Sequence, residues 1–138
     1  MKGPPEVARG WFDKAESDLT AARILLAGPG PYDAVCFHCQ QAVEKYIKGF
    51  LCWRGSTFPF THDLGRLAPL CEAADPTLKL STPEVIALTD YAVRLRYDNG
   101  FWPSHKDGTD AVAVAERVRS AIMARVPPGT HPGPPGHP

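Results

Sequence analysis

Apolar residues recur at intervals of three and four along most of this chain, the period of helices that bury one face. A first helix is predicted to begin near Pro4 and Pro5, because a first-turn proline loses no needed N–H, and to end near Ala27 before a Gly-Pro turn. Asp18 falls within the apolar face of this helix. An unpaired carboxylate there would be costly, so we expect Asp18 to contact a cation or hydrogen-bond donors.

The second predicted helix, from Tyr32 to Trp53, is the most apolar part of the chain and ends at Gly55. A polar stripe occupies about a third of its helical wheel. The stripe consists of Gln41, Glu44, Lys45 and Lys48. The residues on the opposite arc are Val35, Cys36, Cys39, Ala42, Val43, Tyr46, Ile47, Phe50 and Trp53. This stripe is the strongest candidate for chemistry in the sequence.

The rest of the chain predicts three more helices and no strand. A short helix from His62 to Ala74 follows Thr61, a plausible N-cap, and a capping box at residues 81–84 opens a helix that ends near Asp98. A last helix spans Gly108 to Val126. The pattern predicts an all-α, antiparallel, up-and-down four-helix bundle with one additional short helix.

Residues 1–126 are expected to form this single domain. Six of the last twelve residues are proline and three are glycine, which predicts a disordered tail over 127–138. The 15 basic and 15 acidic residues cancel, so any binding of phosphate must come from a local cluster. The chain has no apolar leader segment and no run of about 18 apolar residues. We therefore expect a cytoplasmic protein with no membrane partner.

The four cysteines include one Cys-x-x-Cys pair, Cys36 and Cys39, with no second pair at zinc-finger spacing. Because both lie on the apolar arc of the second helix, buried thiols are favoured over a metal or redox site. We predict no metal and no cofactor.

Several polar side chains lie on or beside faces that point to the core. They are Asp18, Gln40, Gln41, Glu44, Lys45, Lys48 and Arg96. One interpretation is a buried hydrogen-bond network that fixes helix register. The other is a site for a phosphate-bearing ligand, in which Lys45, Lys48, His62 and Arg96 contact the anion.

His62 admits a similar choice between a loop residue beside a helix cap and an anion contact. His105 could instead pair with Arg96 as a ribonuclease site. The arginine would clamp the scissile phosphate, and the histidine would move the proton of the ribose 2′-hydroxyl. An exposed loop histidine without a role is the other interpretation of His105.

Four short segments, in this order and at these separations, resemble the HEPN family of nucleotide-binding domains. They are Ala15-Glu16-Ser17-Asp18-Leu19, Gln40-Gln41-Ala42-Val43-Glu44-Lys45 with Lys48, Thr61-His62-Asp63-Leu64, and Arg96-Tyr97. The resemblance covers about residues 11–124. It implies a helical bundle that pairs with itself, as a dimer or larger homo-oligomer, and a small nucleotidyltransferase as partner in a toxin–antitoxin-like system.

Many members of the family are metal-independent ribonucleases with a compact Arg–His motif near the end of the penultimate helix. Here eight residues separate Arg96 from His105, a longer spacing than that motif has. The resemblance therefore favours a module that binds a nucleotide or phosphate group, with Asp18, Gln41 and Glu44 supporting the cations.

Two other hypotheses stay open. The first is an RNA endonuclease that uses Arg96 and His105, with a second subunit completing the cleft. The second is an assembly subunit without a small ligand, in which the polar stripe only fixes register.

Overall fold

The computed structural model describes residues 3–133, and every regular element among them is helical. The three long helices are α1 (Pro5–Ala27), α2 (Tyr32–Arg54) and α6 (His105–Met123). The three shorter helices are α3 (Leu64–Ala74), α4 (Pro83–Ala87) and α5 (Thr89–Tyr97). A 3₁₀ turn, η1, spans Pro128–Thr130. The predicted all-α bundle is confirmed.

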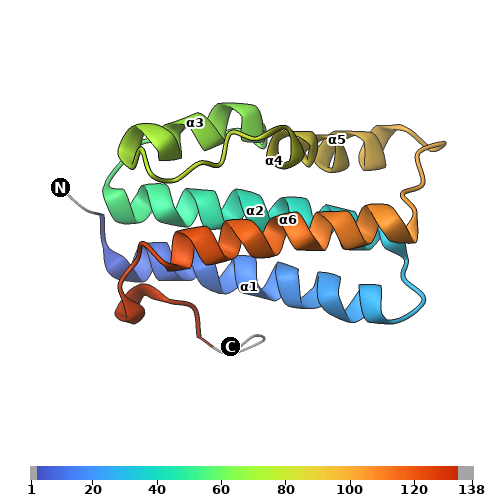
Figure 1. Cartoon of the computed structure of the whole chain (residues 1–138), viewed down its shortest axis with the longest axis horizontal. Coiled ribbons are helices and arrows are strands. Elements are labelled where there is room, and N and C mark those ends of the chain that lie inside the picture. The colour runs from blue at the N-terminus through green and yellow to red at the C-terminus, as the bar shows by residue number, and fades with distance from the viewer. Residues whose placement is uncertain (1–2, 134–138) are drawn as a thin grey trace.

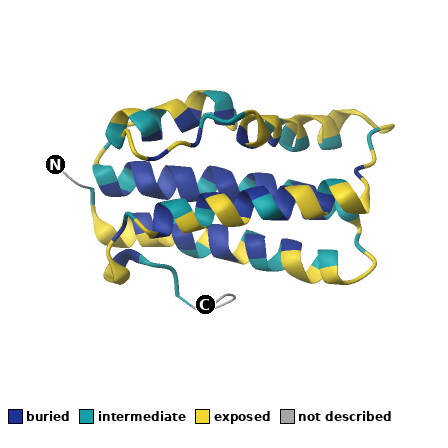
Figure 2. Cartoon of the chain, in the orientation of Figure 1, coloured by how far each residue is buried: buried dark blue, intermediate teal, exposed yellow. Residues whose placement is uncertain are grey.

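Helix α2 is the centre of the bundle. It contacts α1, α3, α5 and α6, with α1 and α6 running beside it and α3, α4 and α5 following one another along its other side (Figure 1). Fourteen of its 23 residues are buried, which appears as the dark central rod of Figure 2. A helix that is apolar on most of its circumference is expected in the interior, so the polar stripe of α2 must meet neighbouring helices and loops.

Two turns fix how the chain enters and leaves α2. Gly30 has φ +92° before the helix, and an added Cβ there would lie 2.8 Å from the backbone nitrogen of Tyr32. Gly55 ends α2 with φ +72°, and its N–H donates to the carbonyl of Cys52. Both positions require the left-handed conformation that glycine adopts without strain. The second turn starts the 55–63 loop, which returns along α2.

The predicted fourth helix is broken into α4 and α5 at Leu88. The N–H of Leu88 donates to Val85 and that of Tyr91 donates to Leu88, so the hydrogen bonds switch to the tighter i→i−3 pattern there. The hydroxyl of Thr89 accepts the N–H of Leu64 at 3.1 Å, which ties the break to the start of α3. This tertiary hydrogen bond is not visible in the sequence pattern.

Two helix starts also differ from the expectation. Helix α6 begins at His105, because Ser104 and Asp107 form a capping box in which each side chain accepts the other's backbone N–H. Helix α3 begins at Leu64, because Asp63 rather than Thr61 is the N-cap and accepts the N–H of Gly65 at 2.8 Å.

Residues 127–133, part of the predicted disordered tail, contact the bundle. Thr130 is buried, and Nε2 of His131 donates to the carbonyls of Met123 and Val126 at 3.1 Å each. The N–H of Gly133 donates to Asp13 at 2.7 Å. These bonds satisfy carbonyls at the end of α6 and anchor the segment to α1. Residues 134–138, the rest of the predicted tail, lie outside the described part of the chain.

Candidate functional site

A buried carboxylate, that of Glu44, is the hub of the polar stripe. It accepts hydrogen bonds from Gln40 Nε2 at 3.1 Å, from Lys48 Nζ at 2.9 Å and from His62 Nδ1 at 2.9 Å. The side chain of Glu44 is 4% exposed, whereas that of His62 is 60% exposed. The hub therefore joins the interior of α2 to the exposed loop that precedes α3.

This geometry decides what His62 presents to solvent. An ionised carboxylate can only accept hydrogen bonds, so Nδ1 of His62 must carry the proton that bonds to Glu44. The other ring nitrogen, Nε2, then has a free lone pair when the ring is neutral and a second N–H when the ring is protonated. His62 can thus act as an acceptor or base in one state and as a donor to an anion in the other.

Lys48 faces inward rather than toward solvent. Its side chain is 6% exposed and pairs with Glu44. Its ammonium lies 5.6 Å, 6.0 Å and 5.9 Å from the ring centres of Trp11, Phe58 and Phe60, close enough for cation–π attraction. Lys48 therefore holds Glu44 in place. The ring of Phe60 is fully exposed on its outer side.

Lys45 belongs to a neighbouring cluster built on Asp18 of α1. One carboxylate oxygen of Asp18 accepts from Lys45 Nζ at 2.5 Å, and the other lies 2.8 Å from His38 Nδ1. Lys45 is thus the cationic partner that we expected for Asp18 because of its place on the apolar face of α1. Lys45 stays 23% exposed, so it remains within reach of a ligand.

Gln41 and Gln40 extend the hydrogen-bonded row. Gln41 Nε2 donates to Gln40 Oε1 at 2.6 Å, and Gln40 Nε2 also lies 3.4 Å from the carbonyl oxygen of His62. The structure thus brings together Gln41, Glu44, Lys48 and His62, with Asp18 of α1 and Lys45 of α2 beside them. Gln41, Glu44, Lys45 and Lys48 are the four residues that form the predicted polar stripe of α2.

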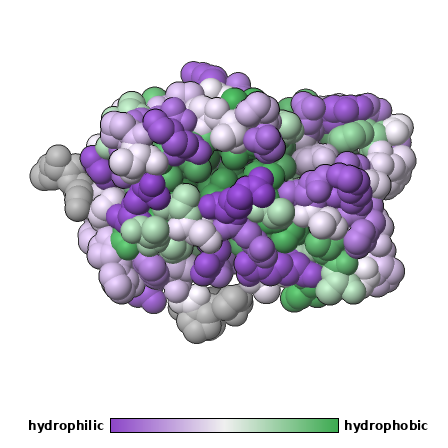
Figure 3. All heavy atoms as spheres, viewed as in Figure 1, coloured by the Kyte–Doolittle hydropathy of each residue, from purple (hydrophilic) through white to green (hydrophobic). Residues whose placement is uncertain are grey.

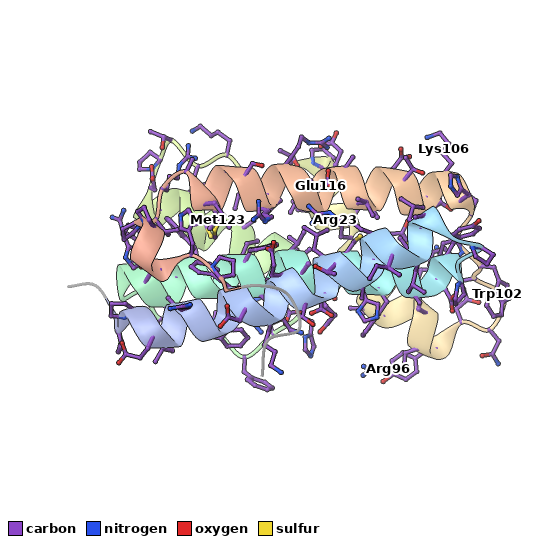
Figure 4. The ribbon with its side chains drawn as sticks, turned by 90° about the horizontal axis from the view of Figure 1, so that it is seen from below. Arg23, Arg96, Trp102, Lys106, Glu116 and Met123 are labelled. Carbon is purple, nitrogen blue, oxygen red and sulfur yellow. The ribbon has the colours of Figure 1, made fainter. Side chains whose placement is uncertain are left out.

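Arg96 and His105 do not join this group. Arg96 lines a separate groove between α5 and the start of α2, beside Asp33 and Phe37, and its side chain points outward from α5, on the side of the bundle opposite to α6 (Figure 4). His105 is the first residue of α6, and its ring packs edge-on against Tyr32 at 5.2 Å. The two side chains therefore have different surroundings, Arg96 beside Asp33 and Phe37 and His105 against Tyr32.

Comparison with known proteins identifies the family. The model of the HEPN domain family matches residues 8–126. The chain belongs to the HEPN domain family. The crystal structure of an archaeal HEPN homologue superposes with a TM-score of 0.68 at 23% identity, covering 91% of this chain and 98% of that one. That likeness supports the HEPN fold. No curated protein matches the chain.

Sequence analysis of this HEPN protein did not assign the aromatic rings to the site. Trp11 comes from α1, and Phe58 and Phe60 come from the 55–63 loop, so nothing in a helical wheel of α2 places them around Lys48. His38 was also missed. Its position seven residues before Lys45 on the same helix was the available signal, because that spacing puts both on one face.

A second buried network in the HEPN bundle is structural. Burial alone would raise the pKa of Glu16, but hydrogen bonds from Arg119 at 2.8 Å and Tyr46 at 2.6 Å outweigh it and lower that pKa.

Burial raises the pKa of the Cys36 thiol to about 11 and that of the Cys39 thiol to about 12. Both thiols are therefore protonated at neutral pH. Among the described residues, no group of three or more His, Cys, Asp and Glu could hold a metal ion.

A further hollow of about 360 Å³ lies between α4–α5 and α6. Its apolar floor includes Leu88 and Val114, and Glu84, Asp107 and Asp110 stand at its edge. Apolar side chains ringed by hydrophilic ones are visible on this face (Figure 3). Within residues 3–133, no helix is long and apolar enough to cross a membrane.

Proposed function

We propose that this HEPN protein is a cytoplasmic binding module for a nucleotide or another phosphate-bearing ligand. It associates with itself and with a small nucleotidyltransferase in a toxin–antitoxin-like system. The observation that carries the ligand proposal is the pair of Glu44 and His62, in which a buried carboxylate orients an exposed imidazole next to the exposed ring of Phe60.

The site offers one contact for each part of a nucleotide. A base stacks on an exposed aromatic ring such as Phe60 with a contribution of roughly 1–3 kcal/mol. The phosphate groups accept hydrogen bonds from protonated His62 and from Lys45. Lys48 and Asp18 act indirectly, because Lys48 neutralises Glu44 and Asp18 orients Lys45. Arg96, in its separate groove, contacts the same ligand only across an assembly of two copies.

The charges of the two clusters nearly cancel. The carboxylates of Asp18 and Glu44 are balanced by Lys45 and Lys48, so a protonated imidazole would give the site a net positive charge, which favours a phosphate group.

Isothermal titration with ATP, AMP and inorganic phosphate tests the proposal. We expect the nucleotides to bind, and His62→Ala and Phe60→Ala to weaken binding about tenfold or more, or about 1.4 kcal/mol. The control is His105→Ala, which changes a histidine that packs against Tyr32 and does not join this group. Absence of heat with every nucleotide, with and without the partner, would overturn the ligand half of the proposal.

The surface of α5 supports the association half. Within the described chain this helix contains no buried residue. Val93 is 50% exposed and Tyr97 is 75% exposed, with Trp102 just beyond the helix at 74%. A helix whose apolar residues stay in solvent is suited to a second copy of the chain or to a partner subunit.

The ribonuclease hypothesis requires a different assembly. Because Arg96 and His105 of one chain have different neighbours, this activity would take the two residues from different copies. RNA cleavage that disappears in His105→Ala but persists in His62→Ala would favour this activity over nucleotide binding at His62.

A further inference from the structure

His62 is the exposed end of a series of hydrogen bonds that begins in the core. Lys48 and Gln40 hold Glu44, and Glu44 holds Nδ1 of His62. The three supporting residues are 5%, 0% and 3% exposed, respectively. Burying the Glu44–Lys48 pair and the amide of Gln40 costs desolvation energy. These buried groups hold the exposed ring of His62 in a fixed orientation. Such an arrangement suits a reactive imidazole.

We infer that His62 is a phosphoryl-acceptor residue, whose Nε2 is phosphorylated by a nucleoside triphosphate bound at this site. The inference rests on the nucleotide binding proposed above and adds a covalent step to it. Nε2 is the nitrogen available for attack, because Nδ1 donates its proton to Glu44.

The step balances without a further reactant. The lone pair of Nε2 forms a bond to the γ-phosphorus, while the bond between that phosphorus and its bridging oxygen breaks. The nucleoside diphosphate leaves with the electron pair of the broken bond. The Nδ1 proton stays in the hydrogen bond to Glu44, whose negative charge offsets the positive charge that the ring acquires during attack. The product is a phosphohistidine.

A comparison with His38, the histidine of the neighbouring cluster, explains why we assign the phosphoryl group to His62. His38 also has a carboxylate partner, Asp18, at 2.8 Å, but its side chain is 33% exposed against 60% for His62. His62 lies two residues after Phe60, whose fully exposed ring provides a stacking surface for a base. Of these two histidines, only His62 combines an exposed side chain with a nearby exposed ring on which a base can stack.

The test uses the full chain with magnesium and ATP that is radiolabelled at either the γ- or the α-phosphate. We expect acid-labile, alkali-stable label from γ-labelled ATP only, lost in His62→Gln and kept in the control His105→Gln, which changes a histidine that packs against Tyr32. Label from α-labelled ATP, or label that survives His62→Gln, would overturn the inference. ATP binding without any label would also overturn it but leave the proposed function standing. Absence of ATP binding would overturn the proposed function itself.

Glu44 is a positioning residue in this scheme, and its test must separate orientation from folding. Glu44→Gln alone leaves Lys48 unpaired in the core, so the second variant is Glu44→Gln with Lys48→Met, which removes both buried charges. We expect a folded protein in which the labelling rate falls about 10- to 100-fold, while ATP affinity changes much less. An unchanged labelling rate in this folded double variant would contradict the role of Glu44.

Discussion

At the residue scale, Glu44 is the buried charge that links the polar stripe of α2 to His62. It is the common partner of Lys48, Gln40 and His62, and Lys48 has no other anion among its described contacts. The sequence predicted that Glu44 and Lys48 share a stripe, since positions four apart on a helix are neighbours. It placed the stripe on or beside faces that point to the core, but it could not show which residues cover the stripe, because that depends on the loop that brings His62 and Phe60 over it.

Glu44→Gln should therefore lower the free energy of unfolding by about 3–5 kcal/mol, because it leaves the buried ammonium of Lys48 unpaired. The control is Glu116→Gln, which breaks an exposed pair with Arg23 and should cost about 0–1 kcal/mol. Urea denaturation of the three proteins gives both values. Equal losses in the two variants would contradict the buried hub.

The buried thiols predict a pH dependence of stability. Burial raises the pKa of Cys39 from 9.0 to about 12 in the folded chain. Between these values the unfolded chain loses the thiol proton while the folded chain keeps it. The free energy of unfolding therefore falls as pH rises, by up to about 1.4 kcal/mol per pH unit from this group.

Cys39→Ala should remove that contribution and give a shallower decline above pH 9.0, the ordinary thiol value. Urea denaturation under reducing conditions across this range measures the slope for each protein. Parallel declines in the wild-type and variant chains would show that Cys39 does not titrate in this way.

At the element scale, α1 and α2 approach closely at Gly49. A Cβ added there would lie 2.5 Å from Phe12 Cε1 and 3.0 Å from Trp11 Cβ. Phe12 is fully buried and has no room to move. The close approach sets Trp11 next to Lys48, so packing between these two helices also shapes the candidate site.

Gly49→Ala should destabilise the protein by about 1–3 kcal/mol through overpacking. Gly10→Ala is the matched control, because Gly10 lies in α1 with nothing within 4 Å of an added Cβ. Its higher helix propensity should stabilise the protein by about 0.5–1 kcal/mol. Thermal or urea denaturation that gives the same sign for both variants would refute this packing.

Helix boundaries show where sequence patterns stop being informative. The long helices α1 and α2 follow the predicted ranges closely, because periodicity and the glycine turns agree there. The break at Leu88 arises from the hydrogen bond between Leu64 and Thr89, residues far apart in sequence. The start of α6 at His105 could have been predicted from Ser104 and Asp107, whose spacing is that of a capping box.

At the scale of the whole molecule, the predicted helices were sufficient for an all-α bundle, and four short motifs carried the resemblance to the HEPN family. The order of the helices does not show which side chains meet in one site. Arg96 borders a predicted apolar stripe, yet it lines a groove separate from the group around Glu44. The return of residues 127–133 onto the bundle was likewise invisible to composition, because three hydrogen bonds to α1 and the end of α6 decide it.

Self-association through α5 is testable at this scale. Val93→Glu and Tyr97→Glu place charges on exposed apolar positions of α5 and should weaken the proposed self-association about tenfold or more. Ile24→Glu is the control, because Ile24 is 67% exposed on α1. Sedimentation velocity over a range of concentrations measures the association. Equal effects of all three changes would contradict an interface on α5.

The proposed nucleotide site requires that Glu44 holds His62 in place as a contact for the ligand. Long-range ¹H–¹⁵N NMR of the histidine side chains, with and without ATP at about pH 8, measures this. We predict that free His62 carries its proton on Nδ1, and that its Nε2 resonance shifts when ATP is added while that of His105 does not. A proton on Nε2 in the free protein, or ATP shifts at His105 without shifts at His62, would contradict the account.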